Sequence, residues 1–392
     1  ITMKNYLTNQ YKKNKKFKIN HNYLSQQFKN YKTILNKIAT VVRRNDFTLG
    51  KEVDKFENKI QKLLKSKYIV SVGSGTDALM LSLKALGIRE GDEVITTPFT
   101  FYATIGAIVT CGAVPKFVDV KDDYNIDEKL IEQAITKKTK AIMPVHWAGR
   151  VCEMNKIKKI SQKYKLPIVE DSCHAILGKY KDKLAGTFGA YGCFSMHPLK
   201  NLNVWGDGGF VICANNSLYK KMKLLRNHGL VDRDKNLIFG YNSRLDTIQA
   251  AVAIEALKKL KNITLRRINN SLFLDKIFLK NKNIIVPNRK KYLKEVFHLY
   301  HIRFKQKTIR DKILKDLIKN KIDAKIHYPT SMHLQPAAKI YGYKKGDFPI
   351  SENLSQTSIS LPVHEFINKK DLFKISKIIL KNLPSWKLDI TK

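Results

Sequence analysis

The stretch CFSMHPLKNLNVWGDGGF, residues 193–210, holds one lysine, Lys200, between an apolar run and a group of glycines. The segments 193–198 and 209–213 have the apolar composition of strands, so Lys200 follows the end of a strand. A lysine kept in a dry pocket has a lowered pKa and attacks a carbonyl as the free amine. The chain contains 73 lysines and arginines, so an arbitrary lysine is most simply a surface residue. Which motifs lie near Lys200 in the fold decides whether it is a catalytic amine or a surface lysine.

Outward from this stretch, strand-like runs alternate with helical patterns between residue 50 and about residue 250. The strand-like runs are 68–74, 92–98, 114–120, 140–146, 166–171, 193–198 and 209–213, and the early helical patterns are 76–87, 100–112, 127–137 and 153–165. This alternation predicts an α/β fold with a large, mostly parallel sheet covered by helices on both faces. Ligands of such sheets bind at the carboxyl ends of the strands. The polar residues expected there are Ser74 to Asp77, His146, Asp171 and Lys200.

The chain of 392 residues is long for one simple core, which predicts a large domain and a smaller one. The large α/β domain is expected over 46–265, and a helical pattern over 240–280 leads out of it. Residues 266–392 combine a strand-like run at 295–304 with helical patterns at 308–321 and 371–383, which predicts a small C-terminal α+β domain. Residues 1–45 are interpreted as a basic N-terminal arm: a solvated tail, an extra contact between subunits or a cloning remnant.

The formal net charge of +40 raises nucleic acid, an anionic membrane or a phosphorylated substrate as partners. Lysine is spread along the whole chain together with many Asn and Ile residues, which favours compositional drift as its cause. No basic cluster interleaved with aromatic residues and no groove-reading motif occurs, so no specific nucleic-acid binding is predicted.

Five cysteines without C-x-x-C spacing argue against a disulfide framework or a metal site and favour a reducing compartment. No apolar run approaches the roughly 18 residues that a membrane span needs, and the first residues lack the apolar segment of a signal peptide. The sequence therefore predicts a cytoplasmic protein without a membrane partner.

Two further motifs lie near predicted strand ends. SVGSGTDAL (71–79) runs from a strand into a helix, whose free N–H groups suit a phosphate, although the motif taken alone favours a simple turn capped by Thr76. IVEDSCHA (168–175) delivers Glu170 and Asp171 at a strand end, either as a solvated turn or as a buried acid that needs a cationic partner. A protonated pyridine nitrogen is such a partner. Together with Lys200, these motifs are the parts of a pyridoxal-phosphate (PLP) enzyme.

At this point the chain resembles the DegT/DnrJ/EryC1/StrS family of sugar aminotransferases, in order from about residue 45 to 365. The matching segments are DFTLGKEVDKFE (46–57), SGTDAL (74–79), GDEVITTPFTFYAT (91–104), AIMPVHWAGR (141–150), VEDSCHA (169–175), the stretch 193–209, RNHG (226–229), GYNSRLDTIQAA (240–251), HYPTSMHLQPA (327–337) and FPISENLSQTSISLPVH (348–364). The resemblance implies the aspartate-aminotransferase-like fold, called fold type I, and PLP as cofactor.

The resemblance also assigns roles around the cofactor ring. It implies that Lys200 forms the Schiff base with PLP and moves the proton, and that Asp171 pairs with the pyridine nitrogen. His174 takes the family's Gln or His position near the phenolic oxygen. Phe101 is expected to stack on the ring, although an aromatic residue there is equally compatible with plain core.

The resemblance further places the phosphate and the substrates. The phosphate ligands implied are Gly75, Thr76, Asp77 and Ser195, with Asn242 and nearby Arg244 reaching the cofactor of a neighbouring subunit in a homodimer with shared active sites. The candidates for the sugar or amino-donor pocket are His146, His327, Tyr328 and His333. As bare residues these histidines are more simply structural. Trp147 stands where the family often has a smaller residue, a difference that concerns the shape of the sugar pocket.

The implied activity is transfer of an amino group from glutamate or glutamine to a keto-sugar, expected to be nucleotide-linked, in amino-sugar biosynthesis. Some relatives carry histidine in place of the lysine and are dehydratases; this chain keeps Lys200. The alternatives left open are a PLP-dependent sugar dehydratase and a PLP-binding regulatory or scaffold protein without turnover.

Overall fold

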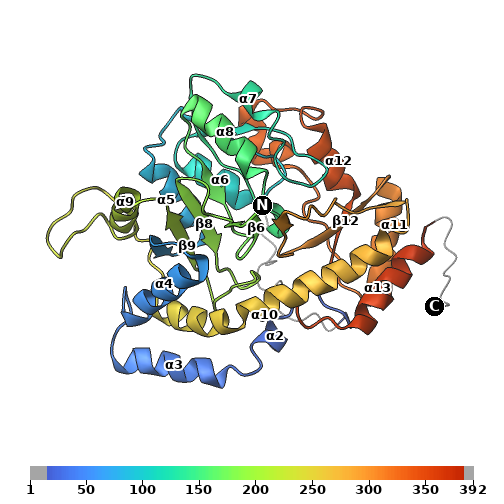
Figure 1. Cartoon of the computed structure of the whole chain (residues 1–392), viewed down its shortest axis with the longest axis horizontal. Helices are drawn as coiled ribbons and strands as arrows, with labels where there is room; N and C mark the ends of the chain where they lie inside the picture. The colour runs from blue at the N-terminus through green and yellow to red at the C-terminus, as the bar shows by residue number, and fades with distance from the viewer. Residues whose placement is uncertain (1–15, 384–392) are drawn as a thin grey trace.

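The computed structural model describes residues 16–383. At its centre lies a sheet of seven strands, of which β8 and β9 are labelled in Figure 1. Four strands pair in the order β1-β9-β8-β5 and three in the order β3-β2-β4, and the parallel bridges Ile142–Ile168 and Val145–Asp171 join the two groups. Only β9 runs antiparallel to its neighbours in this sheet, so the predicted mostly parallel sheet is confirmed. The strands are β1 (Ile69–Val72), β2 (Glu93–Thr96), β3 (Val114–Phe117), β4 (Thr139–Ile142), β5 (Val169–Asp171), β8 (Tyr191–Ser195) and β9 (Gly209–Cys213).

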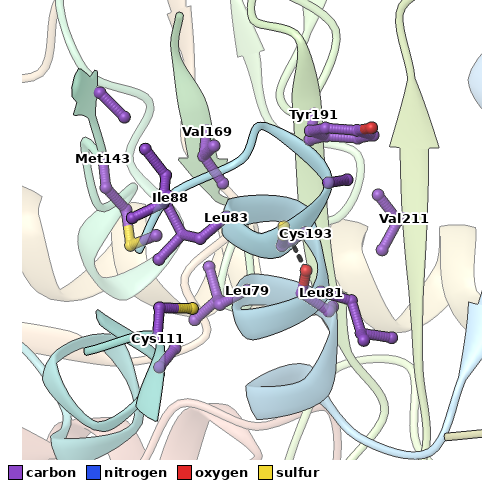
Figure 2. Close-up of a cluster of buried hydrophobic side chains, with 14 of the residues drawn as sticks. Leu79, Leu81, Leu83, Ile88, Cys111, Met143, Val169, Tyr191, Cys193 and Val211 are labelled. Atoms are coloured by element: carbon purple, nitrogen blue, oxygen red, sulfur yellow. Dashed lines mark hydrogen bonds between the residues drawn. The ribbon is translucent and has the colours of Figure 1, made fainter. Parts of the chain in front are cut away.

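The helices of this layer pack their apolar residues against the sheet. They are α4 (Lys51–Leu64), α5 (Gly75–Ala85), α6 (Tyr102–Thr110), α7 (Ile131–Ala134), α8 (Met154–Tyr164) and α9 (Asn216–Arg226), with the short helix η1 (Trp147–Gly149). Figure 2 shows the core beneath α5, where Leu79, Leu81 and Leu83 lie with side chains from several strands. Gly87 has φ +81°, the left-handed conformation predicted for the end of α5.

A second core lies in the C-terminal part of the chain. The sheet β10-β12-β13 is covered by helices, and Tyr300, Ile302 and Phe304 of β12 enter its core. Its elements are β10 (Ile284–Ile285), β12 (Tyr300–Phe304), α11 (Lys307–Lys319), η2 (Met332–Leu334), η3 (Pro336–Tyr341), α12 (Pro349–Thr357), β13 (Ser358–Leu361) and α13 (Lys369–Lys381). The Asp119 carboxylate, just beyond β3, accepts hydrogen bonds from Ile350 N and Ser351 N at the start of α12 and so ties the two parts together.

One continuous helix, α10 (Thr247–Phe278), connects the two cores. In Figure 1 it crosses the lower half of the view, above α3, from near α4 to α13. Its first half gives Ala250, Val252 and Leu260 to the core around α4, and its last turns give Leu274 and Phe278 to the C-terminal core. The predicted boundary between residues 265 and 266 falls inside this helix and stays a prediction.

The beginning of the described chain lies along the body of the protein. Residues 1–15 of the predicted basic arm lie outside the described residues. From residue 16 onward the chain contains α2 (Leu24–Gln27) and α3 (Lys32–Arg43), and α3 contacts α10. Ile19 and Tyr23 are buried, so this part of the predicted arm packs on the fold.

Two local differences from the sequence analysis concern chain segments with weak periodicity. The helix predicted at 127–137 is reduced to the single turn α7. A small sheet, β11-β6-β7, was not predicted; it consists of β6 (Lys179–Tyr180), β7 (Lys183–Leu184) and β11 (Leu293–Lys294).

The five cysteines are free. Within residues 16–383, no helix is both long and apolar enough to cross a membrane.

Candidate active site

Asp171 ends β5 at the carboxyl edge of the sheet and is 6% exposed. Its Oδ2 accepts a hydrogen bond from Thr104 Oγ1 at 2.8 Å, and its Oδ1 accepts one from Cys173 N at 3.2 Å. Among the described residues this carboxylate forms no ion pair. A buried carboxylate without a cation is costly, so the site fits a group that brings a positive charge, such as a protonated pyridine nitrogen.

The neighbouring Glu170 points away from this site, because successive strand residues face opposite sides of a sheet. It is fully buried, and its oxygens accept hydrogen bonds from His146 Nε2 (2.9 Å) and from the N–H groups of residues 186, 188 and 189 (2.8, 2.5 and 2.8 Å). The other ring nitrogen of His146 accepts from Cys152 N at 3.2 Å. His146 is therefore enclosed and fully bonded, and the structure does not place it in the substrate pocket predicted from the resemblance.

Lys200 lies in the loop between β8 and β9, as the sequence indicated, and is half-buried. Its N–H donates to His197 O at 2.8 Å. Burial lowers the pKa of its amine, while the nearby Cys173 and Asp171 act in the opposite direction. The amine of Lys200 is therefore easier to deprotonate than that of an ordinary lysine, as a nucleophile or base requires.

The turn between β1 and α5 presents a helix N-terminus beside Ser195. Ser74 caps the helix by accepting from Asp77 N at 3.0 Å. The N–H groups of Gly75 and Thr76 have no acceptor in the described part of the chain, which suits an anion. A Cβ on Gly75 would lie 2.6 Å from Ser195 Cβ, so glycine is required for this close approach.

Asp77 has a different part in this turn from the one predicted. Its N–H is used by the cap, and its Oδ2 accepts from Ser243 Oγ at 2.8 Å, while the same hydroxyl accepts from Gly73 N at 3.3 Å. The carboxylate of Asp77 therefore bonds Ser243. A negatively charged carboxylate would repel a phosphate. Ser243 was missed because its only sequence signal was its place between Asn242 and Arg244.

His174 is buried beside two other rings. Its centroid lies 4.3 Å from that of His298 and 5.3 Å from that of Trp147. Burial and then the charge of Lys200 lower the pKa of His174 well below 6.5, so the ring is neutral. Its Nδ1 accepts from Ala148 N at 3.3 Å, which leaves the ring proton on Nε2 as a donor.

Several aromatic side chains lie near His174. Phe101, at the start of α6, is 47% exposed, and its ring lies 5.9 Å from that of Tyr328. Trp147 is 1% exposed and lies 5.3 Å from Tyr328, so it fills the space behind the site instead of lining an open pocket. Burial, helped by the charge of Asp171, raises the pKa of the Tyr328 hydroxyl.

The remaining residues predicted for the site differ in whether the structure places them beside it. His327 adjoins the site: burial, then the charges of Lys325 and Lys200, lower its pKa to about 4. His333 does not, because it packs on Phe348 and bonds Glu352 Oε1 at 3.1 Å. Asn242 is exposed, and Arg244 donates to Asn227 Oδ1 at 3.1 Å.

The sequence analysis missed several residues around Lys200. Thr104, which bonds Asp171, lies within a segment that carried the resemblance, but a threonine on a helix gave no separate signal. His21, His298 and His301 also lie near His327 or His174. No group of three or more His, Cys, Asp or Glu side chains within residues 16–383 is arranged to hold a metal ion.

A mostly parallel sheet that brings a lysine, a buried acid and a helix N-terminus to one edge defines the class of aspartate-aminotransferase-like, PLP-dependent transferases. The chain belongs to the DegT/DnrJ/EryC1/StrS aminotransferase family, whose sequence model matches residues 29–380. It is a PLP-dependent sugar aminotransferase.

Individual relatives agree with this assignment. The chain is 34% identical to UDP-4-amino-4,6-dideoxy-N-acetyl-beta-L-altrosamine transaminase from Campylobacter jejuni, over 86% of this chain and 91% of that protein. The solved structure of DesV from S. venezuelae superposes with a TM-score of 0.87 and 31% identity, covering 91% of this chain and 96% of that one. The PLP form of the putative sugar aminotransferase Spr1654 from Streptococcus pneumoniae gives a TM-score of 0.83 at 25% identity, covering 89% and 96%.

Proposed function

We propose that the protein transfers an amino group from glutamate or glutamine to a keto-sugar carried on a nucleotide, with Lys200 as the catalytic lysine. The observation that carries the assignment of the site is that Asp171 at the end of β5, His174 just after it, and Lys200 in the loop after β8 lie at one edge of the sheet. The charge of Lys200 helps to lower the pKa of His174, and the charge of Asp171 acts on the pKa of Lys200. The C. jejuni relative, which is named for a UDP-linked sugar, supports the nucleotide.

The cofactor, when bound, supplies the electron sink that lets a proton leave the carbon bearing the amino group. Asp171 holds the ring nitrogen protonated, and Thr104 orients its carboxylate. The N–H groups of Gly75 and Thr76 and the Ser195 hydroxyl hold the phosphate. Lys200 Nζ binds the cofactor and then accepts and returns the proton.

Around these groups, His174 donates from Nε2 to an oxygen of the cofactor. Phe101 and Tyr328 cover the site and exclude water, which strengthens the electrostatic contacts inside it. His327 lies beside Tyr328 and remains a candidate for contact with the sugar or the amino donor.

We extend this proposal to a homodimer in which each subunit completes the site of its partner. Asn242 is exposed, and Phe239, three residues earlier, is 97% exposed on the same segment. A second copy of the chain that covers this segment brings Asn242, with Arg244 near it, to the phosphate in the partner's site. A monomer with full activity in sedimentation and rate measurements contradicts this part.

The first experiment follows the absorbance of the protein with PLP and then adds glutamate. The expected result is a lysine-bound cofactor band that glutamate converts to the amino form, and borohydride reduction that fixes the cofactor to the peptide containing Lys200. Lys200→Ala loses both signals, while Lys220→Ala, outside the site, keeps them. Fixation elsewhere refutes the assignment of Lys200. Conversion by glutamine alone identifies glutamine as the donor.

The second half of the reaction is then measured with a panel of keto-sugars. The expected acceptor is nucleotide-linked, and the same sugar without its nucleotide is the control. Turnover of the free sugar at an equal kcat/KM contradicts the nucleotide part of the proposal.

A further inference from the structure

We propose that residues 18–28, named here the N-terminal brace, position the loop that carries Lys200, and that Tyr23 and Gln27 are the positioning residues. This inference rests on the proposed role of Lys200. It also gives a function to part of the segment that the sequence analysis interpreted as an arm.

The contact between the brace and the lysine is direct. Tyr23 Oη donates to the carbonyl oxygens of Leu199 and Lys200, at 3.1 and 3.2 Å. These two carbonyls flank the Cα of Lys200. A single buried hydroxyl, 176 residues away in the chain, therefore holds the backbone from which the catalytic side chain extends.

Gln27, one helical turn after Tyr23, makes a second contact with the same loop. Gln27 and Asn203 form a reciprocal amide pair: Gln27 Nε2 donates to Asn203 Oδ1 at 3.1 Å, and Asn203 Nδ2 donates to Gln27 Oε1 at 2.8 Å. Asn203 also donates to the Pro198 carbonyl. Tyr23 thus bonds the loop at Lys200 itself, and Gln27 bonds Asn203, which lies after Lys200 and in turn bonds Pro198 before it.

The other end of the brace is fixed to the C-terminal core. Ile19 forms a parallel bridge with Ile322, and His21 N donates to Asp323 Oδ2 at 3.0 Å. His364 Nε2 bonds the Asn20 carbonyl at 2.9 Å. The brace thus ties the C-terminal core to the loop of the large sheet that carries Lys200, and the chain before α2 is held at both ends.

The surroundings of Tyr23 keep its hydroxyl protonated as a hydrogen-bond donor. The residue is 4% exposed, the guanidinium of Arg267 lies 4.9 Å from its ring centre, and the ring of His364 lies at 5.1 Å. Burial raises the pKa of the Tyr23 hydroxyl to about 12 against the opposing effect of Arg267. The hydroxyl stays protonated at neutral pH, and its single proton is shared between the two carbonyls in a bifurcated hydrogen bond.

The chemistry explains why such a brace matters. A catalytic amine must reach its target in a narrow range of positions, and a small displacement of its backbone lowers the rate while substrate binding stays largely intact. Loss of the Tyr23 hydroxyl removes the donor of two carbonyls and frees the Lys200 peptide. The expected signature is a lower kcat with a nearly constant KM for the amino donor.

The test compares Tyr23→Phe, which keeps the ring, with Tyr31→Phe as a matched control; Tyr31 lies three residues beyond the end of the brace and is 48% exposed. Tyr23→Phe is expected to lower kcat by about tenfold. In the protein without cofactor, amide hydrogen exchange of Lys200 and Val204, which bond within the loop, is expected to be about tenfold faster. Tyr31→Phe changes neither. Gln27→Leu, which removes the amide pair alone, accelerates the same exchange.

The outcomes separate the brace from the role of Lys200. If Tyr23→Phe keeps wild-type kcat and exchange within twofold while its urea midpoint is unchanged, the brace is refuted. If kcat and KM change together, or exchange rises throughout the protein, Tyr23 is only structural and the proposal also fails. If borohydride fixes the cofactor of the wild type outside Lys200, the proposed function fails, whereas the exchange result still reports on the brace.

Discussion

Replacement of Glu170 and of Asp171 by their amides should give opposite results, because the two carboxylates face different partners. Both oxygens of Glu170 accept only N–H donors, two at each oxygen. In Glu170→Gln the NH2 group must face two of these donors in either orientation. The tautomer of His146 cannot adapt without losing its bond from Cys152 N.

The size of the expected loss of stability follows from the four hydrogen bonds that Glu170 accepts. A hydrogen bond to a charged group contributes roughly 1.5–3 kcal/mol, and each buried donor left without an acceptor costs about 1–3 kcal/mol. Glu170→Gln is therefore expected to lower the free energy of unfolding by about 4 kcal/mol, a large part of the 5–15 kcal/mol typical of proteins.

Asp171→Asn keeps its hydrogen bonds. Its amide oxygen accepts from Cys173 N, and its NH2 group donates to Thr104 Oγ1. The Thr104 hydroxyl then turns to Thr100 Oγ1, 2.7 Å away. The expected loss of stability is under about 1 kcal/mol. The partner of the pyridine nitrogen loses its charge, so transamination with glutamate should fall by more than about 100-fold.

Urea unfolding of the two proteins without cofactor, with equal m-values, measures stability, and the glutamate half-reaction measures chemistry. The reasoning is refuted if Glu170→Gln unfolds within 1 kcal/mol of the wild type. It is equally refuted if Asp171→Asn is the less stable variant or transaminates within tenfold of the wild-type rate.

Two further predictions concern pH and the phosphate turn. Burial lowers the pKa of seven histidines around the brace and the site: His21, His174, His197 (to about 4), His298, His301, His327 (to about 4) and His364 (to about 3). Their folded pKa values lie below the unfolded value of about 6.5, so their contribution to stability is complete above pH 6.5 and is lost as the pH falls toward 4. The free energy of unfolding should fall by more than the roughly 1.4 kcal/mol per pH unit that one proton gives; a flat profile from pH 7 to 5 contradicts this. Gly75→Ala should weaken PLP binding at least tenfold in equilibrium titration, because its Cβ meets Ser195, whereas Gly106→Ala, which has open space, should bind normally; equal affinities would show that the turn adapts.

The sequence predicted the sheet and its functional edge well, because those depend on local apolar runs. Strand alternation placed Asp171 and Lys200 correctly, and Gly87 marked a helix end. The residues alone left Glu170 and Asp171 together at a strand end, and only the resemblance chose Asp171 as the partner of the pyridine nitrogen. His146 could be separated from the site only by its bonds to Glu170 and Cys152.

What the sequence could not predict are contacts between distant segments that involve ordinary residues. The bond from Tyr23 to the Lys200 loop has no periodicity, and its basic surroundings favoured interpretation as an arm. Asp77 matched a phosphate motif, yet its carboxylate bonds Ser243. A tyrosine or serine in a loop has many possible partners, and only the folded chain selects one.

Helix α10 has a practical consequence for dissecting the protein. Its 32 residues form a rod of about 48 Å that enters both cores without a break. A fragment starting at residue 266 would begin in mid-helix, with new unbonded N–H groups at its end, and would lack the brace that bonds Asp323 and the Asn20 carbonyl that bonds His364. The two parts are therefore expected to fold as one cooperative unit, and a split at the predicted boundary should yield fragments that recover their structure only when mixed.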